Sequence, residues 1–374
     1  MKWSWKIGQV AGIGIYVHWT FMILIGWIAM SDVVGGKPPA EAILGIAFVV
    51  ALFACIVLHE LGHALTAQRF GVRTRDITLL PIGGVARLER IPENPAQEFW
   101  IAVAGPAVNV VIAAVLAAVL WLGRHEFGGF ESMPTRGNFF EQLMYVNCLL
   151  VLFNMIPAFP MDGGRVLRAV LAHFSGDYVA ATQTAASIGQ ALAILFGFLG
   201  MFGTNPMLMF IALFVFLGAQ EEAYAVQTRA ALKGLPVRNA MMTHFHALSP
   251  DDTLEAAVQE LLAGAQQDFP VTIDGQVVGL LLRADLLRAL GEGGNQQRVG
   301  DVMRKQCATV EDNEWLESTF QRMRESDCPS LPVVRSGQLV GMITLENVGE
   351  LLMVDSAIRE SRSHQPPATV SQAK

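Results

Sequence analysis

Apolar residues dominate the first 226 residues of this 374-residue chain and recur in runs long enough to cross a membrane. A helix needs about 20 such residues to span the ~30 Å hydrocarbon core of a bilayer. Runs of this kind lie at residues 13–31, 43–66, 99–122, 139–159, 185–203 and 206–225. The pattern predicts a polytopic α-helical membrane core of about six spans, with both chain ends on the same side of the membrane.

After residue 236 the chain becomes more polar and repeats itself. Residues 269–282 match residues 331–344 at a constant offset of 62 residues; each stretch begins with an apolar residue, Pro and Val and continues with Gly-Gln-x-Val-Gly. An amphipathic helical pattern precedes each stretch, and a second helix follows it. Self-similarity of this kind predicts two copies of one small α/β unit packed against each other.

These patterns together predict the domain organisation. Residues 1–226 form the membrane core, residues 227–236 a linker and residues 237–355 the α/β pair, with repeats at 237–294 and 299–355. Residues 356–374 are polar and rich in Ser and Ala, and we expect them to form a disordered tail.

The composition supports a membrane location and excludes some functions. Hydrophobic residues make up 52% of the chain and charged residues only 16%, against roughly a quarter in soluble domains. The net charge of −7 and a pI near 5.6 argue against a nucleic-acid partner, which requires a basic surface. Four cysteines are scattered without a Cys-x-x-Cys pair, which indicates neither a disulfide framework nor a cysteine-only metal site.

Positive charge predicts the orientation of the core. Cations are concentrated between the second and third predicted spans and again after the sixth, at Arg69, Arg73, Arg75, Arg87, Arg90, Arg229, Lys233 and Arg238. The loops near residues 32–42 and 123–138 hold far fewer. By the positive-inside rule, we expect a multi-pass cell-membrane protein whose N-terminus, arginine-rich loop and C-terminal half are cytoplasmic.

The arginine-rich loop has a pattern of its own. Residues 74–90 contain two short apolar-rich runs around Pro81 and the Gly83-Gly84 pair. Two interpretations remain open: a hairpin that lies partly in the membrane surface, or an ordinary connector on the polar side.

The stretch His59-Glu60-Leu-Gly-His63 in the second predicted span is the strongest candidate for chemistry. Residues four apart lie on one face of a helix, so two imidazole nitrogens can bind one metal ion. Glu60 lies beside that ion, where it can transfer protons. Ionisable side chains inside a membrane are costly and are usually functional. We therefore expect a metal site here, in preference to two buried, hydrogen-bonded histidines with an unrelated glutamate.

A catalytic zinc site needs a third protein ligand and an open position for water. Asp162, in Pro160-Met-Asp162-Gly-Gly at the end of the fourth predicted span, is the best candidate. The second and fourth spans run in the same direction, and His59 and Asp162 lie ~24 Å and at most ~30 Å along them at 1.5 Å per residue. Both would then reach the cytoplasmic third of the membrane. The alternative is that Asp162 only caps the helix that follows Gly163-Gly164.

Two further polar residues lie in the apolar runs. Cys55, one helical turn before His59, either faces the ion or is a small buried side chain. His18 in the first predicted span is either a gate or a hydrogen-bonded packing residue, and its role is unassigned.

With these residues the sequence resembles the site-2 protease family of intramembrane zinc metalloproteases (peptidase M50 type). The branch with a C-terminal pair of CBS domains, as in the bacterial sporulation-factor protease, is the most similar. Three motifs carry the resemblance: His59-Glu-Leu-Gly-His63, Ala104-Gly-Pro-Ala-Val-Asn109 in the third predicted span, and Asn154…Pro160-x-Asp162-Gly-Gly.

The resemblance implies roles for individual residues. Three of them correspond to the ligands of one zinc ion per chain: His59, His63 and Asp162. Glu60 corresponds to the catalytic residue, and Asn154 and Pro160 match positions that engage the substrate.

The α/β pair resembles tandem CBS domains, which often bind adenine nucleotides through a hydroxyl and an Asp in a Gly-x-x-Thr-x-x-Asp pattern. The first copy, from Gly279 to Asp285, has the Asp but no hydroxyl at the Thr position. The second, from Gly341 to Asn347, has Thr344 but no Asp. Asp285 and Thr344 are therefore candidate contacts to ATP or AMP. The alternative is a purely structural role, or one in forming a homodimer through the CBS domains.

These observations predict a zinc metalloendopeptidase in regulated intramembrane proteolysis. Its substrate would be a membrane-anchored protein, such as a transcription-factor precursor or an anti-sigma factor, cut at a transmembrane or membrane-proximal bond. Glu60 would take a proton from the attacking water and return one to the leaving amine. Pairing of an extended substrate with the edge of the 74–90 hairpin is a further hypothesis. Two alternatives are a CBS-gated ion channel or transporter and a membrane scaffold that captures its partner without cutting it.

Overall fold

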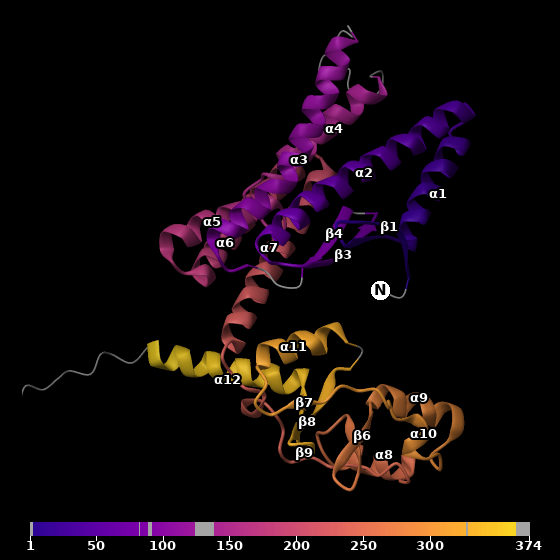
Figure 1. The fold of residues 1–374 in the computed structure, drawn as a ribbon, viewed down its shortest axis with the longest axis vertical. Helices are drawn as coiled ribbons and strands as arrows, with labels where there is room; N and C mark the ends of the chain where they lie inside the picture. Colours follow the sequence, from indigo (N-terminus) through magenta and orange to yellow (C-terminus); the bar gives the residue numbers. More distant parts are fainter. Residues whose placement is uncertain (1–2, 82, 89–91, 124–137, 327, 364–374) are drawn as a thin grey trace, which may run out of the picture. The chain divides into compact units, whose positions relative to one another are not determined.

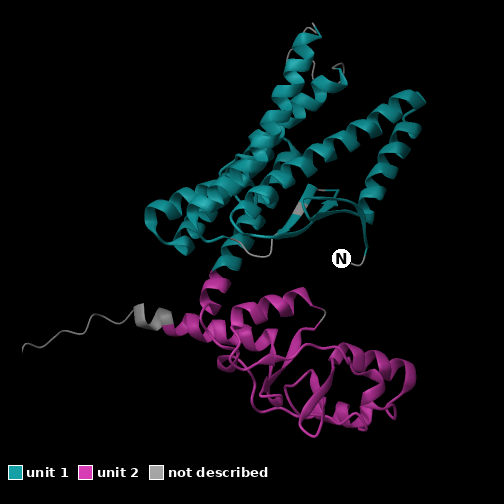
Figure 2. Ribbon diagram, viewed as in Figure 1, with its two compact units in different colours: residues 1–226 teal, residues 227–374 magenta. Residues whose placement is uncertain are grey.

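Apolar helices make up most of the first of two compact units, residues Met1–Val226, and the second unit consists of residues Gln227–Lys374 (Figure 2). The computed structural model describes residues 3–81, 83–88, 92–123, 138–326 and 328–363. The elements that begin in the first unit are β1 (Ser4–Val10), β2 (Ile13–His18), α1 (Trp19–Val34), α2 (Pro39–Arg69), β3 (Thr74–Leu80), β4 (Gly83–Leu88), α3 (Pro95–Leu122), α4 (Phe139–Asn154), α5 (Asp162–Ser175), α6 (Tyr178–Phe202) and α7 (Pro206–Leu232) (Figure 1).

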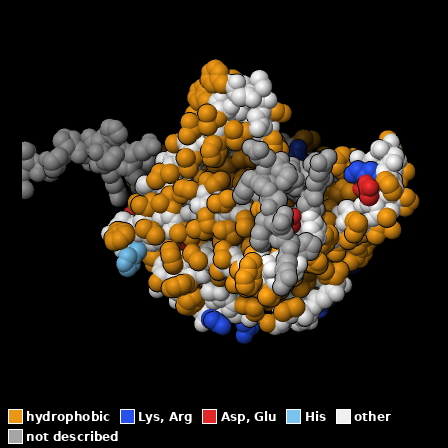
Figure 3. Space-filling view, turned by 90° about the horizontal axis from the view of Figure 1, so that it is seen from above, with side chains coloured by type: hydrophobic (Ala, Val, Ile, Leu, Met, Phe, Trp, Pro, Cys, Tyr) orange, Lys and Arg blue, Asp and Glu red, His pale blue; other side chains and the backbone are white. Residues whose placement is uncertain are grey.

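The helical core has the dimensions of a membrane domain. Among the described residues, α2, α3, α6 and α7 are long and apolar enough to cross a bilayer, and α1 and α4 are apolar but shorter. Many large hydrophobic side chains on these helices are exposed, and hydrophobic side chains cover most of the face shown in Figure 3. So large an exposed apolar surface suits lipid and not water. The predicted polytopic helical core is confirmed, with four long helices and two shorter ones.

Local sequence signals determine where several helices begin and end. Asn94 and Asp177 cap α3 and α6 by accepting hydrogen bonds from backbone N–H groups two and three residues further on. α5 ends at Gly176, whose φ of 70° lies in the left-handed region that favours glycine. His18 caps α1, because its Nδ1 accepts a hydrogen bond from the backbone N–H of Thr20. The side chain left unassigned by the sequence is therefore a helix cap.

The prediction of a first span at residues 13–31 is wrong at its start. Residues 13–18 form β2, and α1 begins only at Trp19. β2 pairs antiparallel with β1 and parallel with β3, which gives a four-stranded sheet of order β1-β2-β3-β4. Ile13, Ile15 and Val17 are buried in this strand. A short run of β-branched residues cannot be distinguished from the start of a buried helix by periodicity alone.

The sheet shows that residues 74–90 contain a hairpin, whose place in the membrane surface stays a prediction. β3 and β4 form an antiparallel hairpin, so the hairpin is confirmed over the described residues, and residues 82 and 89–90 lie outside them. Ile77 and Leu79 on β3 are buried in clusters that include Leu61 and Phe53 of α2. β3 lies inside the sheet and β4 at its edge. Within the hairpin, the strand with an edge available for pairing is therefore β4 and not the apolar strand β3.

The fourth predicted span, residues 139–159, is helical only as far as Asn154. Residues 155–161 are not helical and lead directly into α5, which begins at Asp162. Pro157 and Pro160 lie in this segment, and proline disfavours a continuing helix because it lacks an N–H and clashes with the preceding turn. The chain therefore unwinds just before Asp162, as the two prolines predict.

The second unit contains two α/β repeats, each with its own hydrophobic core. One core includes Leu254, Phe269 and Leu281, and the other includes Leu316 and Val333. The strands form one two-stranded and one three-stranded sheet, β5-β6 and β7-β8-β9. The elements are a short 3₁₀ helix (Val237–Asn239), α8 (Leu254–Ala263), β5 (Phe269–Ile273), β6 (Gln276–Leu281), α9 (Arg283–Gly293), α10 (Val299–Val302), β7 (Val310–Glu311), α11 (Leu316–Glu325), β8 (Ser330–Arg335), β9 (Gln338–Thr344) and α12 (Leu345–Ser363).

Two predicted irregular segments are partly helical. α7 continues to Leu232, so residues 227–232 of the predicted linker 227–236 belong to a helix. The polar residues Gln220, Glu221 and Glu222 lower the hydropathy without ending the helix, because Gln and Glu are good helix formers. α12 likewise runs to Ser363, so the tail predicted from residue 356 is helical over its first part. Residues 364–374 lie outside the described residues.

Candidate metal centre

His59 and His63 lie one turn apart in the C-terminal third of α2. Both side chains are buried, and their ring centres are 4.7 Å apart. The two Nε2 atoms are 3.1 Å apart. The helix therefore directs both imidazoles at one point, as their spacing predicts.

Asp162 reaches the same point from the first turn of α5. Its Oδ2 lies 3.2 Å from His59 Nε2 and 3.0 Å from His63 Nε2, and the residue is buried. Its other oxygen, Oδ1, lies 3.7 Å from Nη1 of Arg165. The N-cap of α5 is Met161, and no side chain caps this helix end. The cap-only interpretation of Asp162 is therefore wrong, and the three predicted ligand residues form one cluster.

Hydrogen bonds on the far side of each ring show which nitrogen carries the proton. His63 Nδ1 lies 2.6 Å from the carbonyl oxygen of Ile101, which can only accept, so Nδ1 is the donor. His59 Nδ1 lies 2.9 Å from Oδ1 of Asn109 and donates in the same way. In a neutral imidazole the other nitrogen then holds a lone pair. Both Nε2 atoms and the Asp162 carboxylate thus present lone pairs to one another.

Three converging lone pairs fit a metal cation and little else. Two imidazoles and one carboxylate are a donor set that zinc hydrolases use, with a further position open to water. The bonds from Nδ1 to Asn109 and Ile101 are those that orient histidine ligands in metal sites. The residues present therefore fit a zinc ion.

Gly105 on α3 makes room for this cluster. A Cβ added there would lie 2.2 Å from His63 Nε2 and 2.7 Å from His59 Nε2. One turn later on the same helix, Asn109 is fully buried. The sequence predicts no role for Gly105 or Asn109, although both belong to the motif Ala104–Asn109. An amide and small residues inside an apolar span could have indicated their roles, because both kinds of residue favour close contacts between membrane helices.

Glu60 follows His59 directly and is half-buried. The edge strand β4 passes beside it, since a Cβ on Gly84 would lie 2.7 Å from Glu60 Cγ. The structure thus brings together the metal cluster, the predicted proton-transfer residue and an unpaired strand edge.

The two predicted substrate residues lie near the cluster along the chain but are not bonded to it. Asn154, the last residue of α4, donates its side-chain amide to the carbonyl of Leu150 at 3.0 Å. Pro160 is exposed, two residues before Asp162. No hydrogen bond between the cluster and either residue is present among the described residues. Cys55 is buried beside Asn147, whose amide lies 3.5 Å from its sulfur, and it is not part of the cluster.

The two predicted nucleotide contacts in the second unit already have protein partners. The Asp285 carboxylate accepts hydrogen bonds from Arg288 Nη2 at 2.7 Å and Arg304 Nε at 2.6 Å. Thr344 Oγ1 accepts from the backbone N–H of Asn347 at the start of α12, at 3.1 Å. Each residue therefore has a structural role, and Asp285 also links the first repeat to Arg304 of the second.

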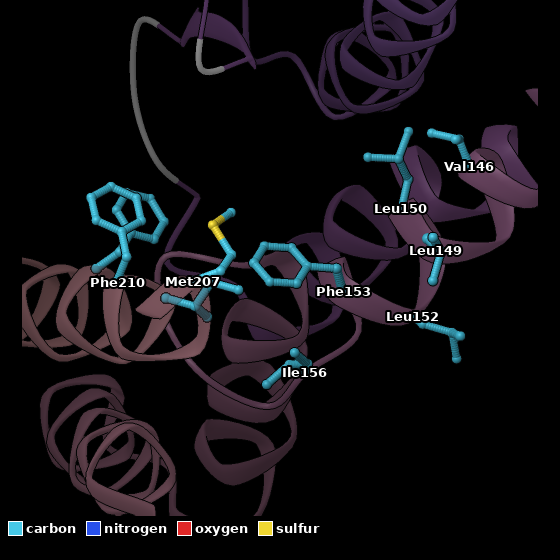
Figure 4. Close-up of a pocket in the computed structure, with 10 residues that line it drawn as sticks. Val146, Leu149, Leu150, Leu152, Phe153, Ile156, Met207 and Phe210 are labelled. Carbon is cyan, nitrogen blue, oxygen red and sulfur yellow. The ribbon is translucent and has the colours of Figure 1, made fainter. Parts of the chain in front are cut away.

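An apolar groove of about 960 Å³ lies between α4 and α7, away from this chemistry (Figure 4). Its lining is entirely hydrophobic: Val146, Leu149, Leu150, Leu152, Phe153, Ile156, Met207, Phe210, Ile211 and Phe214. No side chain in this lining can act as an acid, a base or a ligand. The chemistry of the first unit therefore belongs to the buried cluster and not to the groove.

Comparisons with known proteins agree with the geometry. A model of peptidase family M50 matches residues 47–133 and 132–197, and a CBS domain model matches residues 237–292 and 299–353. A zinc metalloprotease of Methanocaldococcus jannaschii is 31% identical over 348 residues, which cover 93% of this chain and 96% of that protein. Stage IV sporulation protein FB of Bacillus subtilis is 30% identical over 122 residues, 32% of this chain and 38% of that protein.

A solved structure is also similar. The site-2 protease from Methanocaldococcus jannaschii is 35% identical to the matched part, with a TM-score of 0.43. The match covers 59% of this chain and 95% of that one.

Proposed function

This chain belongs to peptidase family M50 as a membrane-embedded zinc metalloprotease of the site-2 type with a C-terminal CBS pair, and we propose that it cleaves membrane-anchored proteins within or beside the bilayer. The observation that carries the proposal is the convergence of His59 Nε2, His63 Nε2 and Asp162 Oδ2 inside an apolar helical core. A site on a membrane-spanning helix favours substrates that are themselves held in the membrane.

The proposed chemistry assigns a separate task to each residue. His59, His63 and Asp162 would hold a zinc ion, which would supply Lewis-acid chemistry by polarising the scissile carbonyl and lowering the pKa of the attacking water toward ~7. Glu60 accepts the proton of the attacking water and then donates a proton to the leaving amine. Asn109 and the Ile101 carbonyl keep the two histidines in the tautomer that leaves Nε2 free.

The substrate segment is proposed to bind as an added strand on β4. A peptide bond in a helix is internally hydrogen-bonded, so the substrate must unwind before attack. β4 is an edge of the sheet and runs beside Glu60, which supports pairing there. Side chains and N–H groups alternate direction along a strand.

A proline scan of the substrate tests this pairing. Proline at every second residue near the scissile bond is expected to block cleavage, because only those N–H groups would donate to β4, and the residues between should tolerate it. Loss of cleavage without a period of two would count against strand addition. A membrane-inserted substrate of proven sequence serves as the parent for the series.

Orientation and substrate class follow from charge. With the arginine-rich loop and the second unit in the cytoplasm, the cluster lies in the cytoplasmic third of the bilayer, and substrates are cut near their cytosolic ends. The proposed substrates are single-span proteins that release a cytosolic domain, such as a transcription-factor precursor or an anti-sigma factor. In right-side-out vesicles the second unit is expected to be protected from added protease, and its digestion from outside would contradict the orientation.

One assay separates the protease from its rivals. Purified protein in lipid is incubated with single-span substrates, and wild type is compared with Glu60→Gln under zinc-replete conditions. Cleavage by wild type alone is expected. A channel or transporter would give ion flux without cleavage, and a scaffold would give binding without cleavage. Persistent cleavage by Glu60→Gln would remove Glu60 from the proposed mechanism.

For the CBS pair we propose ATP or AMP as the regulatory ligand, bound through Asp285 and Thr344. The ribose would have to displace Arg304 from Asp285 and compete with the cap at Thr344, so weak binding is expected. Calorimetry of the full chain with each nucleotide measures it, with Asp285→Asn as the comparison. If no binding heat is measured at millimolar nucleotide, or if Asp285→Asn gives the same heat as wild type, the CBS pair has a structural or dimerising role instead.

A further inference from the structure

A buried ionic cluster, separate from the metal centre, joins α5 to α3 and α7. Its centre is Arg168 on α5, whose side chain is 1% exposed. Its guanidinium donates from Nε and Nη2 to Oε1 of Glu98 on α3, the Nε bond being 2.9 Å. From Nη1 it donates to Oε1 of Glu222 on α7 at 2.5 Å. The carbon of the guanidinium also lies 4.9 Å from the ring centres of Phe159 and Tyr178.

Stability alone is a poor explanation for such a cluster. Taking charges out of water carries a penalty that their mutual attraction often only offsets. Here two carboxylates share one guanidinium, and Oε2 of Glu98 has no hydrogen-bond partner among the described residues. Buried ionisable groups in a membrane protein usually serve function. Arginine can bind two carboxylates through its planar fork while its faces stack on aromatic rings, and lysine cannot.

The cluster lies directly behind the segment that presents Asp162. Arg168 and Asp162 share the short helix α5, so a shift of one moves the other. Phe159, on which the guanidinium stacks, belongs to residues 155–161 and is followed by Pro160. Arg168 therefore contacts both the helix that carries the metal ligand and the segment that leads into it.

One face of α7 packs against residues 155–161. Residues at helical spacing form this face, namely Val215, Gly218, Ala219 and Glu222. A Cβ on Gly218 would lie 2.6 Å from Cδ of Pro160, so α7 packs against one side of that exposed residue. Ala219 shares a hydrophobic cluster with Phe159. The ion pair of Glu222 with Arg168 lies on this same face, one turn beyond Gly218.

We propose that Arg168 is a positioning residue of the protease. By binding Glu98 and Glu222 it holds α5 and residues 155–161 in place, so that Asp162 stays at the metal site and Pro160 keeps its contact with α7. The role given to Pro160 rests on the proposed function, whereas the role given to Asp162 rests on the metal cluster alone.

Two variants of the full-length chain in lipid nanodiscs test this proposal against a matched control. Glu222→Gln removes one charge from the cluster and leaves the Glu98–Arg168 pair. Arg168→Lys keeps the positive charge but loses the fork. The control, Arg322→Gln, breaks an exposed ion pair with Glu314 in the second unit. The measurements are the zinc Kd by competition with a chelating dye, kcat and KM at saturating zinc, and the thermal midpoint.

Both cluster variants are expected to raise the zinc Kd by about 10–100-fold, the range for residues that orient metal ligands. At saturating zinc, kcat should remain below wild type, and the control should match wild type throughout. A purely structural role would lower the thermal midpoint and leave zinc Kd and kcat of the folded protein unchanged. That result, or a wild-type zinc Kd and kcat in Arg168→Lys, would overturn the proposal.

Zinc affinity is measured without substrate, so the two proposals fail in different ways. Absence of cleavage by wild type would sink the proposed protease function while the zinc Kd values still decide the role of Arg168. If wild type cleaves normally and both variants keep the wild-type zinc Kd and kcat, only the positioning role of Arg168 is contradicted.

Discussion

At the scale of single residues, Gly105 is a position where α3 packs against the metal ligands without room for a side chain. A Cβ there would overlap both imidazoles, at 2.2 Å and 2.7 Å from their Nε2 atoms. We predict that Gly105→Ala displaces the histidines and lowers zinc affinity about tenfold or more. Metal analysis after dialysis against a fixed free zinc concentration measures the loss. Gly197→Ala is the control, since its Cβ would meet only the Cβ of Ala212 at 3.7 Å, and zinc loss in both variants would contradict the crowding argument.

The sequence identified the ligands but not the groups that orient them. His59 and His63 follow from their spacing, and Asp162 follows from the direction of the spans. Asn109 is different, because its role depends on which face of α3 meets α2. Ile101 acts through its backbone carbonyl, which no side-chain pattern encodes. Residue identity predicts what a side chain can donate or accept, whereas a tautomer depends on distances that only packing provides.

Cys307, in the second unit, gives a test outside the membrane. Burial, and next the adjacent Cys328 thiol, raises the pKa of the Cys307 thiol from 9.0 to about 12. The folded state thus favours the protonated thiol, and the stability this contributes is complete below pH 9.0 and is lost as the pH rises towards 12. Because only the thiolate is nucleophilic, iodoacetamide at pH 8 should alkylate Cys307 about a thousandfold more slowly in the folded than in the denatured chain.

Timed labelling followed by mass spectrometry of the Cys307 peptide measures both rates. The denatured chain is the internal control, because the same thiol is compared in two environments. Similar rates in the folded and denatured chain would show that the local environment does not hold the proton on Cys307.

At the scale of elements, the inner position of β3 means that a proline in this strand would disrupt the sheet itself. Ile77 is fully buried on β3, between β2 and β4, where a proline removes a ladder hydrogen bond. We predict that Ile77→Pro, and Leu79→Pro likewise, prevents folding of the sheet, so lost cleavage in either variant would say nothing about substrate pairing. Ile7→Pro is the control, since Ile7 is exposed at the irregular register between Lys6 and Gly8 on the edge strand β1. Size-exclusion profiles in detergent measure folding, and a folded Ile77→Pro variant would contradict the prediction.

Hydropathy predicted the helices well. A long run of apolar residues in lipid must hydrogen-bond its own backbone, and a helix does this within a single segment. Hydropathy failed at β1 and β2, where six or seven residues suffice for a strand and the apolar run continues into α1 without a polar break. The β3–β4 hairpin was detectable from Pro81 and the glycine pair. Its place in a four-stranded sheet was not, because the partner strand β2 lies more than fifty residues earlier in the chain.

At the scale of the whole molecule, α7 is the element that belongs to both units. It begins at Pro206 and ends at Leu232, and the boundary between the units falls at residues 226 and 227. The sequence predicts a linker at residues 227–236, after the last apolar run, and the hydropathy drops from Gln220 onward. That drop marks where the helix leaves the apolar region and not where the helix ends. A continuous helix is stiffer than a flexible linker, so we predict that a displacement at Leu232 reaches Gly218 along α7.

Leu232 allows that transmission to be tested. It is 1% exposed in the same hydrophobic core of the second unit as Leu331 on β8, so truncating either to Ala should lower the free energy of unfolding of that unit by about 2–5 kcal/mol. Of the two residues, only Leu232 lies on the helix whose middle, at Gly218, packs against Pro160. We predict that Leu232→Ala changes kcat/KM for cleavage by about fivefold or more, the lower end of typical coupling between sites, and that Leu331→Ala does not. Both are assayed at a temperature where unfolding curves show the second unit intact. Equal effects would mean that cleavage responds to the stability of the unit as a whole, and no effect of Leu232→Ala would exclude α7 as the route.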